Sequence, residues 1–403
     1  MKPILVLTYW SFKDALIQTY TLPYVRMITR ISGRKVYLLC LEQSIIATSI
    51  EERSRLQADL AKDNIEVLFL DYNRFGLKQA FLWIGYVFKL VFLIVQKRVE
   101  FIHAWCTPGG AIGYILSVIT QTPLIIDSYE PHAESMVENG SWLKNSLAYK
   151  ILYYLERKQS ERAKNFIAVS SKMQNYAEET YKVKIPDKHF FVKPACTNLE
   201  LFNSKIDNSL LVNELGLKNK LVCIYAGKLG GIYLDDEVFD FIRECYNFWG
   251  EKFRFLMLTN ASREEVLGQV RRINIPENVL IRKFVQHAEV PAYMALGDFA
   301  LNPVKPVPSK RCCTSIKDGE YWATGLPVVI TANISDDSDI IEKNDIGYVL
   351  KELNQNEYIK AVKKIDLLLG ADRAFLKQKI RNVAKTYRSF KIAERLYEKI
   401  YTG

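Results

Sequence analysis

Short apolar runs alternate with amphipathic segments along the first half of the chain. The apolar, β-branched runs predict strands at residues 4–8, 36–40, 65–70, 101–105, 123–127 and 166–169. Between them the pattern favours helices at 15–32, 51–62, 77–96, 108–120, 144–162 and 172–180, the first of which is closed by Gly33. Strands and helices alternating at this spacing predict a parallel sheet with both faces covered.

The alternation breaks at residues 193–203 (KPACTNLELFN) and then restarts. Strands are expected at 221–225, 253–258, 279–281, 299–301, 327–331 and 348–350, with helices at 236–248, 262–272, 290–296, 316–324, 339–343 and from 355 to the end. A chain of 403 residues is also too long for one ordinary core. We therefore predict two doubly wound, Rossmann-like α/β domains, residues 1–196 and 197–386, that face a cleft. Ligands of such sheets bind at the carboxyl ends of the strands, so the cleft is the expected active site.

Composition narrows the function classes. Hydrophobic residues make up 49% and charged residues 25%, as in soluble globular proteins. The net charge of +10 is spread along the chain without a block of Lys and Arg, which fits acidic small molecules or an anionic membrane surface and argues against nucleic acid. Seven scattered cysteines suit reduced thiols in a cytosol. The four histidines lack metal-ligand spacing, so no metal and no other cofactor is expected.

The longest apolar run is FLWIGYVFKLVFLIV at residues 81–95, interrupted by Lys89. It falls short of the ~20 residues that a spanning helix needs. A core helix is the first interpretation, and an interfacial helix whose Lys89, Lys97 and Arg98 reach lipid headgroups is the second. The N-terminal apolar run is too short for a signal peptide. We expect a cytoplasmic protein, with the inner face of a membrane as an alternative location.

Residues 309–332 (SKRCCTSIKDGEYWATGLPVVITA) hold the clearest candidate site. A helix is expected from Ile316 to Thr324, because Gly325 suits its left-handed C-terminal position and Ser315 with Asp318 forms an acidic variant of the capping box at its start. Unpaired N–H groups and the helix dipole make such a start an anion site. Lys317 adds a cation there. An ordinary helix-to-strand unit with solvated charges is the alternative interpretation of this spacing.

A second candidate is the glycine turn AGKLGG at residues 226–231, directly after the first strand of the second domain. Glycines allow a ligand to approach the backbone, and Lys228 places a cation at the strand end. A plain tight turn is the alternative, since neither a P-loop nor GxGxxG is present.

Together, AGKLGG, EYWATGLPVV and IRKFVQHAEVPAYMALGDFALNPV resemble the second domain of family 4 glycosyltransferases of the GT-B fold. VKPACTNLELF resembles the interdomain passage of that family. RSFKIAERLYEKIY resembles its last helix, which implies that residues of about 387–403 return to the first domain. The resemblance implies a retaining enzyme that takes a sugar from a nucleotide-sugar donor in the second domain to a hydroxyl acceptor in the first, without a metal.

The resemblance also implies roles for individual residues. Glu320 would bind the donor ribose and Lys228 would neutralise the leaving diphosphate. The remaining donor-binding positions are Gly227, Gly230, Phe284, Val285, Thr314, Ser315, Ile316 and Lys317. In the first domain Tyr129 stands where the family commonly has a histidine that contacts the sugar. His132 follows three residues later and is the expected functional imidazole, with Trp10, Asp14, Tyr129 and Glu130 as further acceptor-side candidates.

Three departures from the family pattern concern the same site. Cys312 replaces a common glutamate, Tyr233 stands where a second basic residue is usual, and TYWSFKDAL replaces a glycine pair after the first strand. Lys310, Arg311 or Lys317 would have to supply the missing cation. The sequence thus predicts a glycosyltransferase with a glycan, a lipid-linked compound or a small hydroxyl compound as acceptor. A nucleotide-sugar epimerase and an inactive nucleotide-sugar-binding scaffold are the alternatives.

Overall fold

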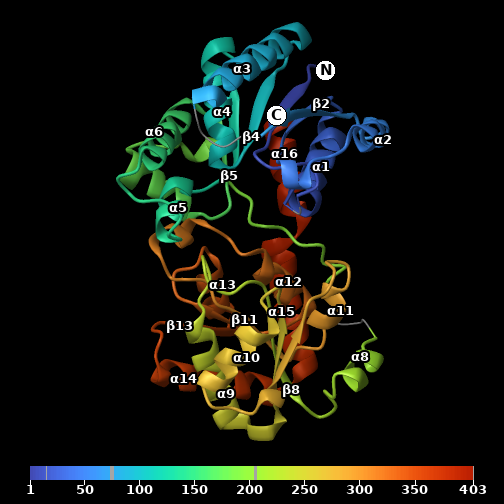
Figure 1. Ribbon diagram of the computed structural model, residues 1–403, viewed down its shortest axis with the longest axis vertical. Coiled ribbons are helices and arrows are strands. Elements are labelled where there is room, and N and C mark those ends of the chain that lie inside the picture. Colours follow the sequence, from blue (N-terminus) through green and yellow to red (C-terminus); the bar gives the residue numbers. More distant parts are fainter. Residues whose placement is uncertain (15, 73–76, 204–206, 403) are drawn as a thin grey trace. The chain divides into compact units, whose positions relative to one another are not determined.

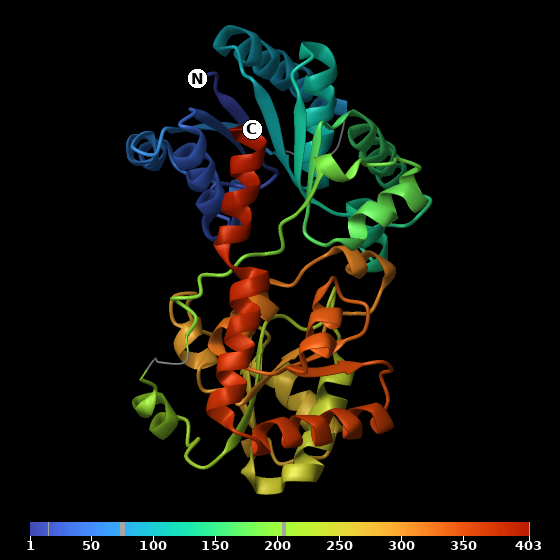
Figure 2. The same cartoon turned by 180° about the vertical axis from the view of Figure 1, so that it is seen from behind.

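The computed structural model describes residues 1–14, 16–72, 77–203 and 207–402. The chain divides into two compact units (Figures 1 and 2). The N-terminal unit contains Met1–Lys193 and Lys391–Gly403, and the C-terminal unit contains Pro194–Phe390. The chain therefore passes between the units twice, after residue 193 and after residue 390. Each unit is a parallel α/β sheet with helices on both faces, as the alternating pattern predicted.

The described part of the N-terminal unit has a seven-stranded sheet in the order β3-β2-β1-β4-β5-β6-β7. The order reverses at β1, so right-handed crossovers send the earlier and later helices to opposite faces. Figures 1 and 2 show α1, α2 and α16 on one face and α3, α4 and α6 on the other. The strands are β1 (Ile4–Leu7), β2 (Val36–Glu42), β3 (Ile65–Asp71), β4 (Phe101–Trp105), β5 (Leu124–Tyr129), β6 (Asn165–Ala168) and β7 (Phe190–Val192). The helices are α1 (Leu22–Ser32), α2 (Ile50–Ala61), α3 (Leu77–Lys97), α4 (Cys106–Thr120), α5 (His132–Glu138), α6 (Leu147–Arg162), α7 (Lys172–Tyr176) and α16 (Phe390–Tyr401).

The described part of the C-terminal unit has a six-stranded sheet in the order β10-β9-β8-β11-β12-β13. Its strands are β8 (Leu221–Ala226), β9 (Phe253–Leu258), β10 (Leu280–Lys283), β11 (Phe299–Asn302), β12 (Val328–Thr331) and β13 (Gly347–Leu350). Its helices are α8 (Ser209–Glu214), α9 (Asp236–Trp249), α10 (Arg263–Arg272), α11 (Val290–Met294), α12 (Ile316–Thr324), α13 (Asp337–Asn344), α14 (Gln355–Gly370) and α15 (Arg373–Arg388). The order reverses at β8, which places the glycine turn and α12 at the switch point of the sheet.

Sequence patterns located most elements within a few residues but missed some. The expected helix from residue 15 begins at the π-helical turn Leu16–Thr21 and continues as α1, and residue 15 itself lies outside the described residues. Helices α5 and α8 and strand β7 were not expected. All three are short, and the three residues of β7 are only partly buried, so none of them produces a long periodic pattern.

A buried polar cluster fixes the returning helix α16 on the N-terminal unit. The Lys193 ammonium lies 2.7 Å from Asp127 Oδ1 and donates to the Tyr397 hydroxyl at 2.8 Å, while Tyr397 donates to Asp127 Oδ2 at 2.7 Å. The aromatic rings of Tyr24 and Trp105 each lie 3.9 Å from the same ammonium. Burial raises the pKa of the Asp127 carboxyl, but the charge of Lys193 and the bond from His103 outweigh it, and the pKa falls to about 2.

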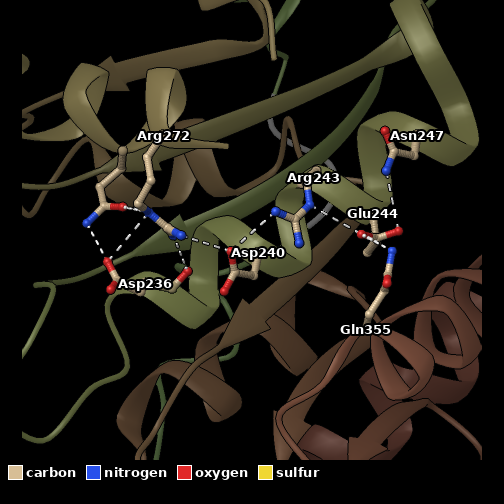
Figure 3. A network of polar contacts seen from close by, with 8 residues as sticks. Asp236, Asp240, Arg243, Glu244, Asn247, Arg272 and Gln355 are labelled. Atoms are coloured by element: carbon tan, nitrogen blue, oxygen red, sulfur yellow. Dashed lines mark hydrogen bonds and ion pairs between the residues drawn. The ribbon is translucent and has the colours of Figure 1, made fainter. Parts of the chain in front are cut away.

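The outer helices of the C-terminal unit pair their charges among themselves (Figure 3). Arg272 on α10 lies 3.1 Å from Asp240 on α9, and Arg243 lies 3.3 Å from Glu244. Gln355 of α14 donates to the same Glu244 carboxylate at 3.1 Å. This network joins three helices and leaves little net charge on that surface.

Candidate functional site

The candidate donor residues lie at the carboxyl edge of the C-terminal sheet. The register pairs Ala226 at the end of β8 with Leu258 at the end of β9, and Leu258 with Lys283 at the end of β10. The glycine turn and Phe284–Val285 therefore follow strands that end level with each other. Neighbouring strands lie ~4.8 Å apart, so about 10 Å separates the two segments. Phe284 is 65% exposed, and Val285 packs against the core.

Helix α12 contacts the glycine turn directly. A Cβ atom on Gly227 would lie only 2.7 Å from Lys317 Cε and 2.7 Å from the Tyr225 hydroxyl, so a larger residue would collide with both. The Ala226 N–H donates to the Tyr321 hydroxyl at 3.0 Å. Lys317 and Tyr321 are four residues apart and share the helix face that meets the turn. The prediction that the glycine turn and the start of α12 form one site is consistent with these contacts.

Lys228 and Gly230 complete the turn. The Lys228 side chain is exposed, and its backbone carbonyl accepts a hydrogen bond from the Tyr225 hydroxyl. Gly230 has a φ of +70°, a left-handed conformation that glycine adopts without strain. The turn therefore has a backbone held by Tyr225 and an exposed lysine side chain.

Lys317 contacts Tyr233, which stands where the family resemblance implies a second basic residue. Its ammonium donates to the Tyr233 hydroxyl at 2.6 Å and lies 4.0 Å from the centre of that ring. Among the three candidates for a compensating cation, Lys317 has this contact with Tyr233. Tyr233 serves as its support, which sequence spacing could not indicate because the two residues are 84 positions apart.

Glu320 lies one turn into α12. Three residues along a helix correspond to about 60° around its axis, so Glu320 borders the face of Lys317 and Tyr321. Its side chain is partly exposed. Desolvation by the surrounding groups raises the pKa of its carboxyl to about 7, and the charge of Lys317 offsets this only in part. A carboxylate held in this way gains from hydroxyl donors that restore its lost hydrogen bonds with water.

The start of α12 coincides with the expected residue, but its expected capping box is wrong. Ser315 makes no side-chain capping bond. Asp318 is fully buried, and both of its oxygens accept from the Asn302 amide at 2.8 Å. Burial and the adjacent Asp337 hold the pKa of Asp318 well above its usual range. Because the Ser315 hydroxyl does not cap the helix, that side chain does not compete with an anion for the first N–H groups.

Arg388 hydrogen-bonds with Thr314, just before the start of α12. The guanidinium is fully buried, pairs with Asp337, and donates to the Thr314 hydroxyl at 2.6 Å and to the Ala195 carbonyl at 3.2 Å. Thr314 directly precedes Ser315 and Ile316, where the helix begins. Arg388 thus connects the residues just before α12 to Ala195, which follows the first crossing between units. Arg388 is the first residue of the segment RSFKIAERLYEKIY, but sequence analysis assigned it no role.

Replacing Arg388 with methionine is expected to lower the free energy of unfolding by about 3–5 kcal/mol, because Asp337 would remain buried without its partner. Urea unfolding measures the loss, with Lys385→Met on the exposed side of the same helix as the matched control. A loss below ~1 kcal/mol for Arg388→Met would show that the pair contributes little.

The candidate acceptor residues lie at the carboxyl edge of the N-terminal sheet. Trp10 is partly exposed in the segment after β1, and the Asp14 carboxylate accepts from the Leu16 N–H at 2.8 Å. His132 begins α5, after β5, and its Nδ1 lies 3.7 Å from Glu130 Oε1, with both side chains partly exposed. The structure therefore places Glu130 and His132 together.

The interpretation of Tyr129 as an acceptor-side residue needs correction, because the side chain lies in the core. Its side chain is fully buried, hydrogen-bonds with the Ser160 hydroxyl and packs on Phe166 with ring centres 5.3 Å apart. Ser128 before it has a φ of +51°, and the register of β5 shifts between Asp127 and Tyr129. This irregularity turns Tyr129 into the core, where it cannot contact an acceptor.

Sequence analysis did not identify Glu156, which supports the start of α5. Its buried carboxylate accepts from the Ala133 N–H at 2.8 Å and from the Tyr181 hydroxyl at 3.0 Å. Burial raises the pKa of this carboxyl to about 7. Glu156 falls on the buried side of α6, and a glutamate on the apolar side of a helix is the weak signal that could have indicated it.

Comparison with known proteins supports the interpretation of the C-terminal unit. Residues 220–366, about a third of the chain, match the family model described as glycosyl transferases group 1. This segment contains the glycine turn, Phe284–Val285 and α12. No curated protein sequence matches the chain.

Solved structures share the fold over the whole chain. HepE from Anabaena in complex with UDP has 16% identity and a TM-score of 0.74, with 100% of both chains covered. Sucrose-phosphate synthase from Thermosynechococcus elongatus has 14% identity and a TM-score of 0.73, covering 100% of this chain and 98% of that one. WaaG, a glycosyltransferase involved in lipopolysaccharide biosynthesis, has 13% identity and a TM-score of 0.68, with 99% of both covered. The fold is that of GT-B glycosyltransferases.

Proposed function

We propose that this protein is a retaining, family 4 type glycosyltransferase that moves a hexose from a UDP-sugar to a hydroxyl acceptor, in the assembly of a bacterial-type glycan or polysaccharide. The observation that carries the proposal is the closeness of α12 to the glycine turn: the Ala226 N–H donates to the Tyr321 hydroxyl, and a Cβ on Gly227 would lie 2.7 Å from Lys317 Cε. We propose that the turn and the α12 start form one cationic site beside Glu320. The group 1 family match over the same residues supports the reaction class. The complexes of HepE with UDP and with UDP-glucose support the choice of uracil nucleotide.

The chemistry follows from this arrangement. The bond between the anomeric carbon and the diphosphate breaks, a bond from that carbon to the acceptor oxygen forms, and the acceptor's hydroxyl proton passes to the departing diphosphate oxygen. Lys228, Lys317 and the first N–H groups of α12 would stabilise the charge that develops on the leaving diphosphate. Glu320 would hold the ribose hydroxyls. We propose that these groups suffice without a metal or other cofactor. Within the described residues, no group of three or more His, Cys, Asp or Glu side chains could hold a metal ion.

The acceptor would be bound by the N-terminal unit, with His132 and Glu130 as its nearest functional groups and Trp10 and Asp14 along the same sheet edge. A glycan, a lipid-linked compound or a small hydroxyl compound would fit the proposal. We place the protein in the cytoplasm, because an odd number of scattered cysteines suits a reducing compartment.

A nucleotide panel tests the donor. In a panel of UDP-, GDP-, ADP- and CMP-sugars, a sugar that binds and is present at ~100 times its dissociation constant should stabilise the binding unit by about 2.7 kcal/mol, which raises its midpoint of thermal unfolding by about 5–11 °C. We expect the UDP-sugars to give this shift, and no shift from any nucleotide sugar would contradict a donor site.

Turnover then separates the possible activities. A transferase releases UDP only when an acceptor is present, with or without EDTA. Interconversion of the sugar without acceptor would indicate an epimerase, for which the adjacent Glu130 and His132 provide the acid–base pair. Binding without either reaction would indicate a scaffold, consistent with the buried Cys312 at a position where a glutamate is common.

A further inference from the structure

Helix α3 exposes large apolar side chains along one side of its described part, residues 82–97. Phe88 is 72% exposed and Phe92 and Val95 are each 66% exposed, although a solvent-facing helix side is normally polar. The opposite side, with Leu90 and Ile94, is buried. Helical spacing aligns the exposed residues in one stripe rather than scattering them.

Helix α4 continues this surface. It packs against α3 on the same face of the N-terminal sheet (Figures 1 and 2) and exposes side chains near its C-terminal end. We call the combined surface the α3–α4 face, and its apolar members are Ile84, Phe88, Phe92, Val95, Val118 and Ile119. Exposed apolar surfaces of this extent in a folded protein usually mark an interaction site.

Helices α3 and α4 contain no carboxylate, and α3 carries lysines. Between residues 72 and 126 the only carboxylate is Glu100, and it is paired with Arg34. Three exposed cations flank the apolar stripe and make no ion pair within the described residues: Lys89, Lys97 and Arg98. This contrasts with the outer helices of the C-terminal unit, whose charges neutralise each other (Figure 3).

We propose that the α3–α4 face docks on an anionic lipid bilayer surface. The aromatic and aliphatic side chains would enter the boundary between headgroups and acyl chains, while the flanking cations contact lipid phosphates. Helix α3 would lie in the plane of the surface, because its opposite side is packed into the protein. Within the described residues no helix is long and apolar enough to cross a membrane.

Charge favours a lipid surface over a second copy of the chain. A symmetric dimer through this face would bring the same cations from both copies toward each other, and neither α3 nor α4 contains a carboxylate that could compensate them. A helix surface is also convex, which suits insertion into a deformable interface. The docking is independent of the proposed transferase activity.

Vesicle sedimentation of the full chain without nucleotide tests the proposal. We expect at least tenfold stronger partition onto phosphatidylcholine vesicles with ~30% phosphatidylglycerol than onto phosphatidylcholine alone, and loss of the difference at 1 M salt. Phe88→Ser with Phe92→Ser should weaken partition more than tenfold, and Lys89→Glu with Lys97→Glu should weaken it about fivefold or more for each lysine.

Matched controls lie on the other unit. Phe375→Ser removes a 69% exposed phenylalanine from α15, and Lys363→Glu with Lys385→Glu changes exposed lysines of α14 and α15. These variants should bind as the unchanged protein does, and all variants should keep the same thermal midpoint.

Three results would overturn the proposal. They are equal partition with and without phosphatidylglycerol, unchanged binding by the double phenylalanine variant, or a dimer in sedimentation velocity that this variant abolishes while vesicles bind neither form. Because no nucleotide or acceptor is present, none of these results depends on the transferase activity.

Discussion

Replacing Glu320 with glutamine is expected to make the protein more stable at pH 8 and a much poorer catalyst. Desolvation raises the pKa of this carboxyl in the folded protein to about 7, whereas its ordinary value is 4.5. Between these values the folded state holds a proton that the unfolded state has released, so stability falls as pH rises through this range. Glutamine carries no charge, and its gain should therefore be absent near pH 4 and about 1–3 kcal/mol above pH 7.5.

Activity should change in the opposite direction. A carboxylate accepts stronger hydrogen bonds from ribose hydroxyls than an amide does, and a lost charge-assisted bond costs about 1.5–3 kcal/mol. Glu320→Gln should therefore lower kcat/KM for the donor by about 10- to 100-fold, mostly through KM, and Glu320→Ala should lower it further. In the unchanged protein, donor affinity should weaken as pH falls through about 7, and in the glutamine variant it should not.

Urea unfolding at pH 5 and pH 8 and steady-state kinetics measure the two effects. Glu357→Gln is a control, because the pKa of Glu357 is shifted in the opposite direction and the expected stability change has the opposite sign. Burial of Glu357 disfavours its charged form, but the Lys351 N–H, the Lys360 ammonium and the Tyr348 hydroxyl outweigh this and lower its pKa. That variant should lose stability at neutral pH. Full activity in Glu320→Gln would place the donor elsewhere.

Removing either lysine at the glycine turn should lower kcat strongly without unfolding the protein. Lys228 is exposed, and Lys317 is held above Gly227 by Tyr233. If both ammonium groups stabilise the departing diphosphate, Lys228→Ala and Lys317→Ala should each reduce kcat by about 10²–10³, the range found when one stabilising group is removed from a developing anion. UDP release under saturating donor measures the effect, with Lys218→Ala on the same unit as the control.

The pair of Lys317 and Tyr233 allows a rescue experiment. Tyr233→Phe removes the hydroxyl that positions the ammonium and should cost only a few-fold in kcat. Tyr233→Arg in the Lys317→Ala background places a guanidinium near the vacated position and should recover part of the lost activity. Activity in Lys317→Ala equal to that of the unchanged protein would show that Lys228 and the helix start are sufficient.

Local sequence determined which segments became strands and helices. Buried parallel strands are short apolar runs, and this signal depends only on neighbouring residues, so both sheets could be predicted. The same holds for Gly33 and Gly325, whose φ angles of +64° and +88° end α1 and α12 where a left-handed residue was expected. The location of the donor candidates at strand ends also followed from this pattern.

The tertiary structure decided which side chains became available to a ligand. Asp318 turned to Asn302 rather than capping its own helix, Tyr129 turned into the core at an irregularity of β5, and Lys317 reached Tyr233 across 84 positions. Each outcome depends on a partner far away in the chain, because a buried polar group must find a hydrogen bond wherever the fold offers one. Spacing along the sequence carries no record of such partners.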